Sequence, residues 1–559
     1  MSCHPISEYA LLSDCHGSGL VRRDGTLDWL CLPRFDSPAL FAGLLDPDGG
    51  CWRIGPGAPA DFVHRRYLPR SLVLETRFKS SRGEWVLRDA LAVGENNQGH
   101  DLGQDAPHVL LREVECTEGS CRVEVEFAPR PEYGLVKPLL QPAQGGLEAR
   151  GGAAVMLLAT EAELEVDGST ARGILNLDRG ERVGFALQYS TLAEGIPESW
   201  SGEKVHRRIN STLEAWESWS DLHQSYQGPW KDQVLASGRI LQGLTYQPTG
   251  AVVAAPTTSL PEAVGGERNW DYRYTWVRDA SLTLDALWVA ACPDEAYRFF
   301  DFLAGTALTQ MKAKGELQIM FGVDGRHDLS ERELTHLEGW RKSAPVRVGN
   351  GAWDQRQLDV YGELLAAAAK LRDQLSGLSS AAREFLVDAA EAAADRWQEK
   401  DQGIWEIRGE PRDFLYSKLM CWVALDRALA LADLLDAEER VEDWKTVREE
   451  IRSAILEKGW NEEVGAYTQA FGHPDLDAAN LMMPIMGFLP ADHPRMLATM
   501  DAVEDQLTDQ NGFVYRYRSE DGLMGEEGAF LLCTFWLAQA RAMAGQVDRA
   551  REIFERAAG

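Results

Sequence analysis

The hydrophobic and polar positions follow two different periods in the two parts of the chain. Residues 121–127 alternate apolar and charged side chains, which predicts a β-strand with one face in solvent. The preceding run 109–116 and the Glu118-Gly119 dipeptide predict a hairpin partner and its turn. Many short strands separated by turn residues indicate an antiparallel β-sandwich. Further strands are expected at residues 27–32, 153–158, 162–166 and 182–189.

From about residue 229, apolar positions recur at spacings of three and four, which predicts helices. Shorter pieces would bring the total to about twelve helices. Helix pairs recurring with long loops favour a closed ring of helical hairpins over a plain bundle, whose connections are shorter. The longest helices are expected at residues 230–244, 280–291, 357–375, 381–398, 419–435, 439–456 and 527–543.

This change of period predicts two domains. Residues 1–225 should form the β-sandwich domain with its linker, and residues 226–559 should form the helical domain. The boundary is expected within residues 203–227.

Composition limits the partners that this chain can have. The net charge of -30 over 559 residues repels phosphate backbones and anionic lipids, so we expect neither nucleic acid nor membrane partners but a neutral small substrate. Nine scattered cysteines without a CxxC pair, and no apolar signal segment, predict a cytoplasmic protein. The sequence contains no window of eighteen apolar residues, so we expect no membrane span. The oligomeric state stays open.

Loops of the second part gather aromatic, arginine and acidic residues, the mixture that sugar sites use. The first such block, residues 269–279, offers Tyr272, Trp276, Arg278 and Asp279 as substrate-binding candidates. The alternative is a helix-entry loop with an internal ion pair. The density of aromatic and charged residues favours the binding interpretation.

A second block, residues 346–359, offers Trp353 and Gln357 as stacking and hydrogen-bonding candidates. Its Gly349-Asn-Gly351 run permits close approach of a ligand, but it is equally compatible with a simple turn.

A third block, residues 403–409, places Glu406 beside Trp405. An indole next to a carboxyl group can desolvate it and raise its pKa, which suits a general acid. Since Arg408 follows two residues later, a surface salt bridge is the alternative.

A fourth block, residues 525–536, opens a very apolar predicted helix with Glu526 and Glu527. A helix N-terminus favours the ionised carboxylate, which could activate water, although both residues could also merely offset the helix dipole. One protonated and one ionised carboxyl group is the pairing that hydrolysis of a glycosidic bond requires.

Other chemistries find no support in the motifs. The sequence contains no HExxH, GxxxxGK[ST], helix-opening GxGxxG or GxSxG pattern, so we expect no metal site, no nucleotide cofactor and no serine nucleophile of the hydrolase type.

These four blocks, in this order, together with the opening segments 7–14 and 28–36, resemble glycoside hydrolase family 15, which contains glucoamylases and bacterial trehalases. The resemblance implies an N-terminal antiparallel β-sandwich followed by an (α/α)6 helical barrel. It also implies an inverting, exo-acting hydrolase without an organic cofactor.

Residue by residue, the resemblance implies Glu406 as general acid and Glu527 as general base, with Glu526 as the alternative base. It places Trp276, Arg278 and Asp279 around the terminal glucose, with Tyr272 and Trp353 as further matches. Trp405 and Gln357 are substrate-binding candidates from their residue types and their blocks. An inverting enzyme predicts that the two carboxyl groups lie about 6.5–9.5 Å apart.

The implied substrate is a small neutral α-glucoside, with α,α-trehalose first and an α-1,4 or α-1,6 glucan or isomalto-oligosaccharide second. A phosphorolytic enzyme and a non-catalytic sugar-binding protein are the alternatives from other classes.

Overall fold

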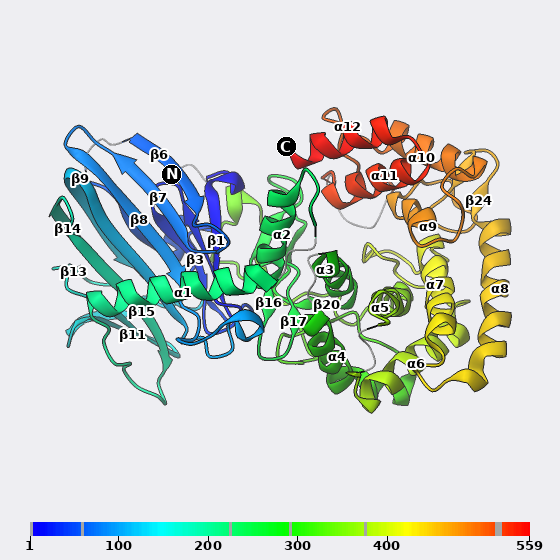
Figure 1. The fold of residues 1–559 in the computed structure, drawn as a ribbon, viewed down its shortest axis with the longest axis horizontal. Helices are drawn as coiled ribbons and strands as arrows, with labels where there is room; N and C mark the ends of the chain where they lie inside the picture. Colours follow the sequence, from blue (N-terminus) through cyan, green and yellow to red (C-terminus); the bar gives the residue numbers. More distant parts are fainter. Residues whose placement is uncertain (1–3, 58–60, 223–225, 290–292, 374–376, 520–527) are drawn as a thin grey trace.

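The computed structural model describes residues 4–57, 61–222, 226–289, 293–373, 377–519 and 528–559. Strands build the N-terminal part and helices the C-terminal part, and the two parts lie side by side (Figure 1). Within the residues described, no helix combines the length and the apolar character needed to cross a bilayer.

The N-terminal part is an antiparallel sheet system of 15 strands that folds into two layers. The strands are β1 (Tyr9–Ser13), β2 (Ser18–Arg22), β3 (Thr26–Cys31), β4 (Ala39–Phe41), β5 (Cys51–Pro56), β6 (Asp61–Tyr67), β7 (Leu74–Lys79), β8 (Gly83–Leu91), β9 (Val109–Ala128), β10 (Leu139–Ala143), β11 (Gly146–Gly151), β12 (Ala154–Thr160), β13 (Glu165–Asp167), β14 (Thr170–Asp178) and β15 (Arg182–Thr191).

Strand β9 belongs to both layers. Its first half pairs with β8 and β15, and its second half pairs with β5 and β14. The predicted hairpin over residues 109–127 is therefore wrong, because Gly119, with φ of 63°, lies within one continuous strand. The other predicted strands are present as β3, β12, β13 and β15 within a few residues.

A helix follows the last strand where the sequence predicted the domain boundary. Helix α1 (Gly202–Leu222) runs along the sheet and covers one of its layers (Figure 1). Its Val205 and Ile209 are buried against Ala186 and Leu111 of the sheet. Apolar residues at spacings of three and four were present in this segment, so the helix was readable from the same pattern as the others.

The helices of the second part alternate between an inner and an outer position (Figure 1). Helices α3, α5, α7 and α11 lie toward the centre, and α4, α6, α8, α10 and α12 lie outside them. The helices are α2 (Lys231–Gly243), α3 (Val277–Val289), α4 (Pro293–Lys314), α5 (Asp359–Lys370), α6 (Ser380–Arg396), α7 (Leu415–Leu431), α8 (Val441–Lys458), α9 (Met482–Ile485), α10 (Pro494–Gln506), α11 (Leu531–Met543) and α12 (Val547–Ala558).

The burial of each helix matches its place in the ring. Helix α7 is buried around almost its whole circumference, as expected for an inner helix surrounded by protein. Helix α8 buries only one face, which includes Trp444, Ile451 and Ile455, and its other faces carry the charges.

Predicted and observed helices agree in position for α2, α3, α5, α6, α7 and α8. The last predicted helix, residues 527–543, is correct in its C-terminal part but begins at Leu531. The residues 528–530 before it are not helical. Helix α4 was not among the predicted long helices.

Among the described residues, five short strand pairs stabilise the loops of the helical part. They are β16 (Thr245–Tyr246) with β17 (Ala251–Val252), β18 (Thr258–Pro261) with β19 (Asn269–Asp271), β20 (Thr275–Trp276) with β21 (Met320–Phe321), β22 (Arg332–Glu333) with β23 (Arg347–Val348), and β24 (Trp460–Asn461) with β25 (Ala466–Tyr467).

An apolar cluster joins the two parts. Trp29 and Tyr133 from the sheet part are buried together with Leu334, Leu337 and Trp340 from the helical part. Since these side chains come from both parts, the hydrophobic effect holds the two parts together at this surface.

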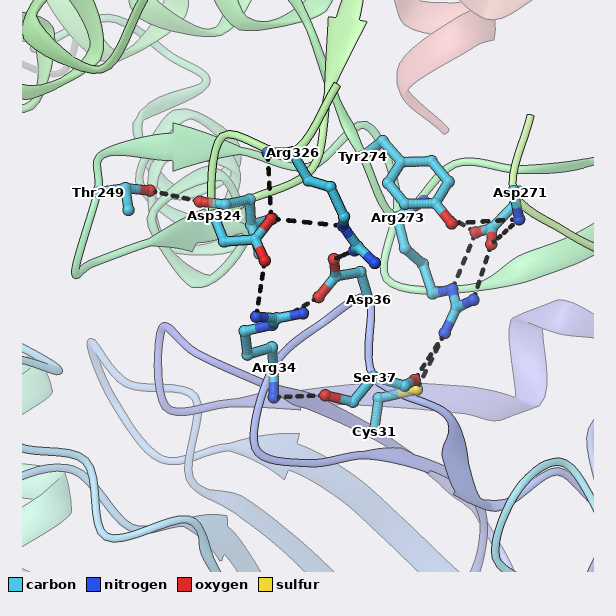
Figure 2. Close-up of polar contacts among 12 residues, drawn as sticks. Cys31, Arg34, Asp36, Ser37, Thr249, Asp271, Arg273, Tyr274, Asp324 and Arg326 are labelled. Atoms are coloured by element: carbon cyan, nitrogen blue, oxygen red, sulfur yellow. Dashed lines mark hydrogen bonds and ion pairs between the residues drawn. The ribbon is translucent and has the colours of Figure 1, made fainter. Parts of the chain in front are cut away.

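Arg273 forms the centre of the polar contacts beside this cluster (Figure 2). Its guanidinium donates to both carboxylate oxygens of Asp271, at 2.9 and 2.7 Å. It also donates to the Ser37 carbonyl at 2.9 Å and to the Tyr133 hydroxyl at 2.8 Å, both in the sheet part. The side chains of Arg273 and Asp271 are both shielded from solvent. The loop that leads into helix α3 is therefore fixed to the sheet part by two hydrogen bonds from Arg273, whose guanidinium is held by the buried ion pair with Asp271.

A second ion-pair network crosses the same surface at its edge (Figure 2). Asp36 accepts from Arg34 at 2.9 Å and from Arg326 at 2.5 Å, and Arg34 also donates to Asp324 at 2.9 Å. Asp36 is buried, whereas the two arginines are partly exposed.

Candidate active site

A cavity of about 370 Å³ lies where the loops before α3, α7 and α11 meet. Its lining combines aromatic, arginine and acidic side chains, as expected for a sugar site. The residues that line it include Glu262, Arg268, Trp270, Tyr272, Arg278, Asp279, Trp405, Glu406, Arg408, Arg516, Tyr517, Gly528, Phe530 and Trp536.

Glu406 is held on this cavity wall by two groups from the first block. The indole Nε1 of Trp276 donates to Glu406 Oε1 at 2.7 Å. Arg278 Nη2 lies 3.6 Å from the same oxygen. The hypothesis of a surface salt bridge with Arg408 is not supported, because the Arg408 guanidinium lies over the Trp270 ring, 5.0 Å from its centroid.

The backbone of Glu406 adopts an unusual conformation. Its φ of 58° lies in the left-handed region, which a non-glycine residue adopts at a cost. Its N–H donates to the Gly403 carbonyl at 3.2 Å, and its carbonyl accepts from Gln355 Nε2 at 3.4 Å. The surrounding loop thus holds this residue in a conformation that aims its side chain into the cavity.

Burial raises the pKa of Glu406 above its ordinary value. Arg278 and the Trp276 hydrogen bond act in the opposite direction, and Asp279 raises the pKa further. The result is a carboxyl group that keeps its proton to higher pH than an exposed glutamate does, which is what a general acid requires.

Replacing Trp276 by phenylalanine tests this balance. The indole N–H favours the ionised form of Glu406, so its loss should raise the pKa of Glu406 and move the alkaline limb of the kcat profile to higher pH. We also expect kcat to fall about 10- to 100-fold, since the indole stabilises the negative charge that develops on Glu406 as its proton leaves.

Trp444→Phe is the matched control for this variant, because Trp444 Nε1 donates to Glu391 Oε1 at 2.8 Å away from the cavity. An alkaline limb that stays in place, or that moves equally in both variants, would contradict the role of Trp276.

Arg278 joins Glu406 to Asp279 at the start of helix α3. Its Nε and Nη2 lie 3.1 and 2.9 Å from Asp279 Oδ2, and it also donates to the Ile404 carbonyl. Asp279 lies in the first turn of the helix, so its backbone position is rigid. The arginine therefore orients both the acid and a second carboxylate that can accept hydroxyl groups of a sugar.

Further carboxyl groups are buried behind Arg278, on helix α5. Burial raises the pKa of Glu363 to about 7, while a hydrogen bond from the Tyr416 hydroxyl and the charge of Arg278 act against that shift. Burial also raises the pKa of Asp359 well above its ordinary value. These groups therefore bind protons more tightly in the folded than in the unfolded chain.

Glu363 gives a testable dependence of stability on pH. Because its folded pKa is raised, its contribution is fully present below the ordinary pKa of 4.5 and is lost as the pH rises to about 7. The Tm of wild type should fall between about pH 5 and pH 8, and in Glu363→Gln this fall should be smaller by at least about 2–4 °C. A change of about 1 kcal/mol in the free energy of unfolding shifts the Tm of a large domain by that amount.

Calorimetric scans at about pH 5 and pH 8 measure the Tm of wild type and of Glu363→Gln. Glu384→Gln, on the exposed surface of helix α6, is the control. Equal falls in Tm for wild type and Glu363→Gln would refute it.

Trp405 forms the aromatic wall beside the acid. Its Nε1 donates to Asp477 Oδ1 at 2.9 Å, and its ring lies 6.0 Å from the ring of Trp536 and 6.1 Å from that of Phe530. Asp477 is buried and is held in turn by Gln469 at 3.2 Å. This support was not predicted, because Asp477 stands far from the other blocks in sequence.

Three of the proposed substrate-binding residues do not line this cavity. Trp276 is buried and reaches the site through its hydrogen bond to Glu406. Trp353 and Gln357 line a separate cavity of about 300 Å³, beside Gln310 and Tyr361, and not the cavity that contains Glu406. A hydrogen bond connects this block to the acid, because the Gln355 side chain donates to the Glu406 carbonyl at 3.4 Å. The sequence placed residues 353 and 357 in the sugar site because of their residue types. Their spacing does not show toward which side of the loop each side chain points.

The proposed base Glu527 and its alternative Glu526 lie outside the described residues. The following residue, Gly528, lines the cavity. Helix α11 begins at Leu531, four residues after Glu527 in the sequence, so the argument from its dipole loses force.

Comparison with known proteins identifies the family. The model of glycosyl hydrolases family 15 matches residues 228–559, and that of the trehalase-like N-terminal domain matches residues 1–191. The chain belongs to glycosyl hydrolase family 15. It is therefore a glycoside hydrolase.

Relatives of this family 15 hydrolase extend along nearly its whole length. The trehalase of Mycolicibacterium smegmatis is 40% identical over 99% of this chain and 85% of its own. The trehalase of Thermoplasma acidophilum is 33% identical over 96% of this chain and 90% of its own.

Among solved structures, a bacterial glucoamylase complexed with acarbose matches with a TM-score of 0.70 at 14% identity. The match covers 100% of this chain and 88% of that one. This likeness shows the fold: the N-terminal sheet domain is followed by an (α/α)6 barrel, as expected from the sequence.

Several residues of the family 15 cavity were missed at the level of sequence. Arg516 and Tyr517 belong to the run Tyr515-Arg-Tyr-Arg518, whose aromatic and cationic mixture is the signal that marked the first block. Glu262 and Arg268 carried no such signal, because they stand in a loop of small and polar residues.

Proposed function

We propose that this protein hydrolyses α,α-trehalose to two glucose molecules with inversion at the attacked anomeric carbon. The observation that carries the proposal is Glu406, a carboxyl group with a raised pKa held by Trp276 and Arg278 on the wall of a sugar-sized cavity. The trehalases that match over nearly the whole chain support the choice of trehalose.

In this mechanism Glu406 donates its proton to the glycosidic oxygen as the bond to the anomeric carbon breaks. Glu527, as general base, removes a proton from the water that attacks the opposite face of the same carbon. Asp279 and Arg278 hold hydroxyl groups of the glucose whose bond is cleaved, Tyr272 and Trp405 cover its apolar face, and the buried Trp276 holds Glu406 in place.

The products distinguish inversion from retention. Inversion releases one β-glucose from the attacked ring and one α-glucose from the leaving ring, whereas retention releases two α-glucose molecules. Proton NMR in the first minutes, before mutarotation, should show equal amounts of both anomers. An initial product that is only α-glucose would contradict inversion.

The choice of substrate and the reaction class are tested by assaying trehalose, maltose, isomaltose and dextrin, each with and without phosphate. We expect the highest kcat/KM on trehalose and the same products in both buffers. Preference for maltose or dextrin would support a glucoamylase-like enzyme instead, glucose 1-phosphate would indicate phosphorolysis, and binding without turnover would indicate a sugar-binding protein. A cytoplasmic location stays a prediction from the sequence.

A further inference from the structure

The hairpin formed by β18 and β19 carries an acidic side chain to the cavity that contains Glu406. Glu262 directly follows β18 and lines this cavity together with Arg268, near the start of β19. A Cβ at position 528 would lie 2.6 Å from the Glu262 carbonyl oxygen, so the hairpin approaches Gly528 closely. Glu262 thus belongs to the same cavity as the proposed acid although it comes from a different loop.

One oxygen of the Glu262 carboxylate is fixed by an ion pair. Arg516 Nη2 lies 3.0 Å from Glu262 Oε1. The Arg516 guanidinium in turn lies 5.5 Å from the ring centroid of Trp405 and 5.9 Å from that of Tyr517. The arginine is therefore held by two aromatic side chains, and it holds the carboxylate in one orientation.

The other oxygen is buried and lacks a hydrogen bond from any residue that the structure describes. Arg268 Nη1 lies 3.9 Å from Glu262 Oε2, which is beyond hydrogen-bond distance. A buried carboxylate oxygen without a donor is costly. Glu262 lines the cavity and its side chain is 17% exposed, so a rotation of the carboxylate toward the cavity lets a hydroxyl group of a bound sugar supply the missing donor.

Tyr272 lines the same cavity as Glu262 and Glu406. Burial raises the pKa of Tyr272 most, and the charges of Glu262 and Glu406 raise it further. The phenol therefore lies within electrostatic range of both carboxylates. Since Arg278 and Asp279 surround Glu406, whereas Arg516 and Arg268 surround Glu262, the cavity has two separate polar groupings, one for each ring of a disaccharide.

We infer that Glu262 is a specificity-determining residue, which accepts hydroxyl hydrogen bonds from the second sugar unit, on the leaving-group side of the cleaved bond. This inference rests on the proposed function. Arg516 positions the carboxylate through its ion pair. The ligand chemistry is a neutral polyol ring presenting adjacent hydroxyl groups, which a planar carboxylate can bind through its free oxygen.

The experiment compares two substrates that share the first glucose and differ in the leaving group. Trehalose has a second glucose, and α-glucosyl fluoride has none. In Glu262→Ala the loss in kcat/KM should be about 10- to 100-fold greater for trehalose than for α-glucosyl fluoride, as for a lost hydrogen bond to a charged group. Glu262→Asp, which retains the carboxylate, should recover part of the trehalose loss.

Glu267→Gln is the matched control, because Glu267 is exposed on the same hairpin and does not line the cavity. Its kcat/KM should equal that of wild type on both substrates. Thermal unfolding of each variant separates loss of fold from loss of recognition.

Equal losses on both substrates in folded Glu262→Ala would overturn the inference and leave Glu262 as a purely structural partner of Arg516. Unchanged trehalose kcat/KM would overturn it as well. Failure of the proposed function is distinguishable from these results, since it would appear as wild-type protein that hydrolyses α-glucosyl fluoride but not trehalose.

Discussion

Replacing Glu406 by glutamine is expected to lower kcat on trehalose by about 10²- to 10⁴-fold, the range that a positioned general acid contributes. Glutamine keeps the size of the side chain and can still accept from the Trp276 indole at Oε1, so the loop should retain its structure. What the variant lacks is the proton for the glycosidic oxygen. Steady-state kinetics of the purified variant measure the loss of kcat, and circular dichroism measures whether its structure is retained.

The leaving group makes this prediction specific for an acid. Fluoride departs from α-glucosyl fluoride without protonation, so Glu406→Gln should lose far less activity on this substrate than on trehalose. Glu410→Gln, on the exposed part of the same loop, is the control and should behave as wild type. Near-wild-type turnover of trehalose by Glu406→Gln would remove Glu406 from the role of acid.

Replacing Arg273 by leucine should produce the largest effect on stability. The substitution leaves the fully buried Asp271 carboxylate without its cation and removes the donors to Ser37 and Tyr133 across the surface between the two parts. Breaking a buried pair by removing one partner costs about 3–5 kcal/mol. Urea unfolding followed by tryptophan fluorescence measures the change.

Arg326→Leu is the comparison for that variant. Its side chain is 48% exposed, and its partner Asp36 keeps Arg34 at 2.9 Å. We expect a cost below about 1 kcal/mol, as for exposed pairs. If Arg273→Leu were no more destabilising than Arg326→Leu, the buried pair would not be what fixes the loop before helix α3.

The Arg273–Asp271 ion pair also explains why the sequence could not show which residues of the first block are structural and which line the cavity. The block contains two Asp–Arg pairs, Asp271 with Arg273 and Arg278 with Asp279. The first pair is the internal ion pair that the alternative interpretation expected, and the residues of the second pair line the cavity. Sequence spacing could not separate them, because the difference lies in which pair contacts the sheet part.

The second block also shows that sequence spacing does not give the direction of a side chain. Trp353 and Gln357 have the chemistry of sugar-binding residues, yet they line a different cavity from Glu406. In contrast, Tyr272, Arg278, Asp279, Trp405 and Glu406, chosen from equivalent patterns, line one cavity. Composition marks a loop as suited to a ligand, but the direction of each side chain depends on the backbone path through that loop.

Strand β9 is an example at the level of the fold. Its alternation and the Glu118-Gly119 pair are compatible with a hairpin, and local preferences alone favour a turn there. The strand continues because β8 and β15 bind its first half while β5 and β14 bind its second half. These pairings join residues far apart in the chain, so no short window contains them.

The sequence by itself determined the two kinds of secondary structure, most helix positions, the residue proposed as acid and the family, because periodicity and motifs are local properties of the chain. Only the tertiary structure decided that β9 unites two layers, that Arg273 ties the α3 loop to the sheet part, and that Glu262 shares a cavity with Glu406. Each of these depends on contacts between distant segments, whose formation requires the whole chain to bury its apolar surface in one arrangement.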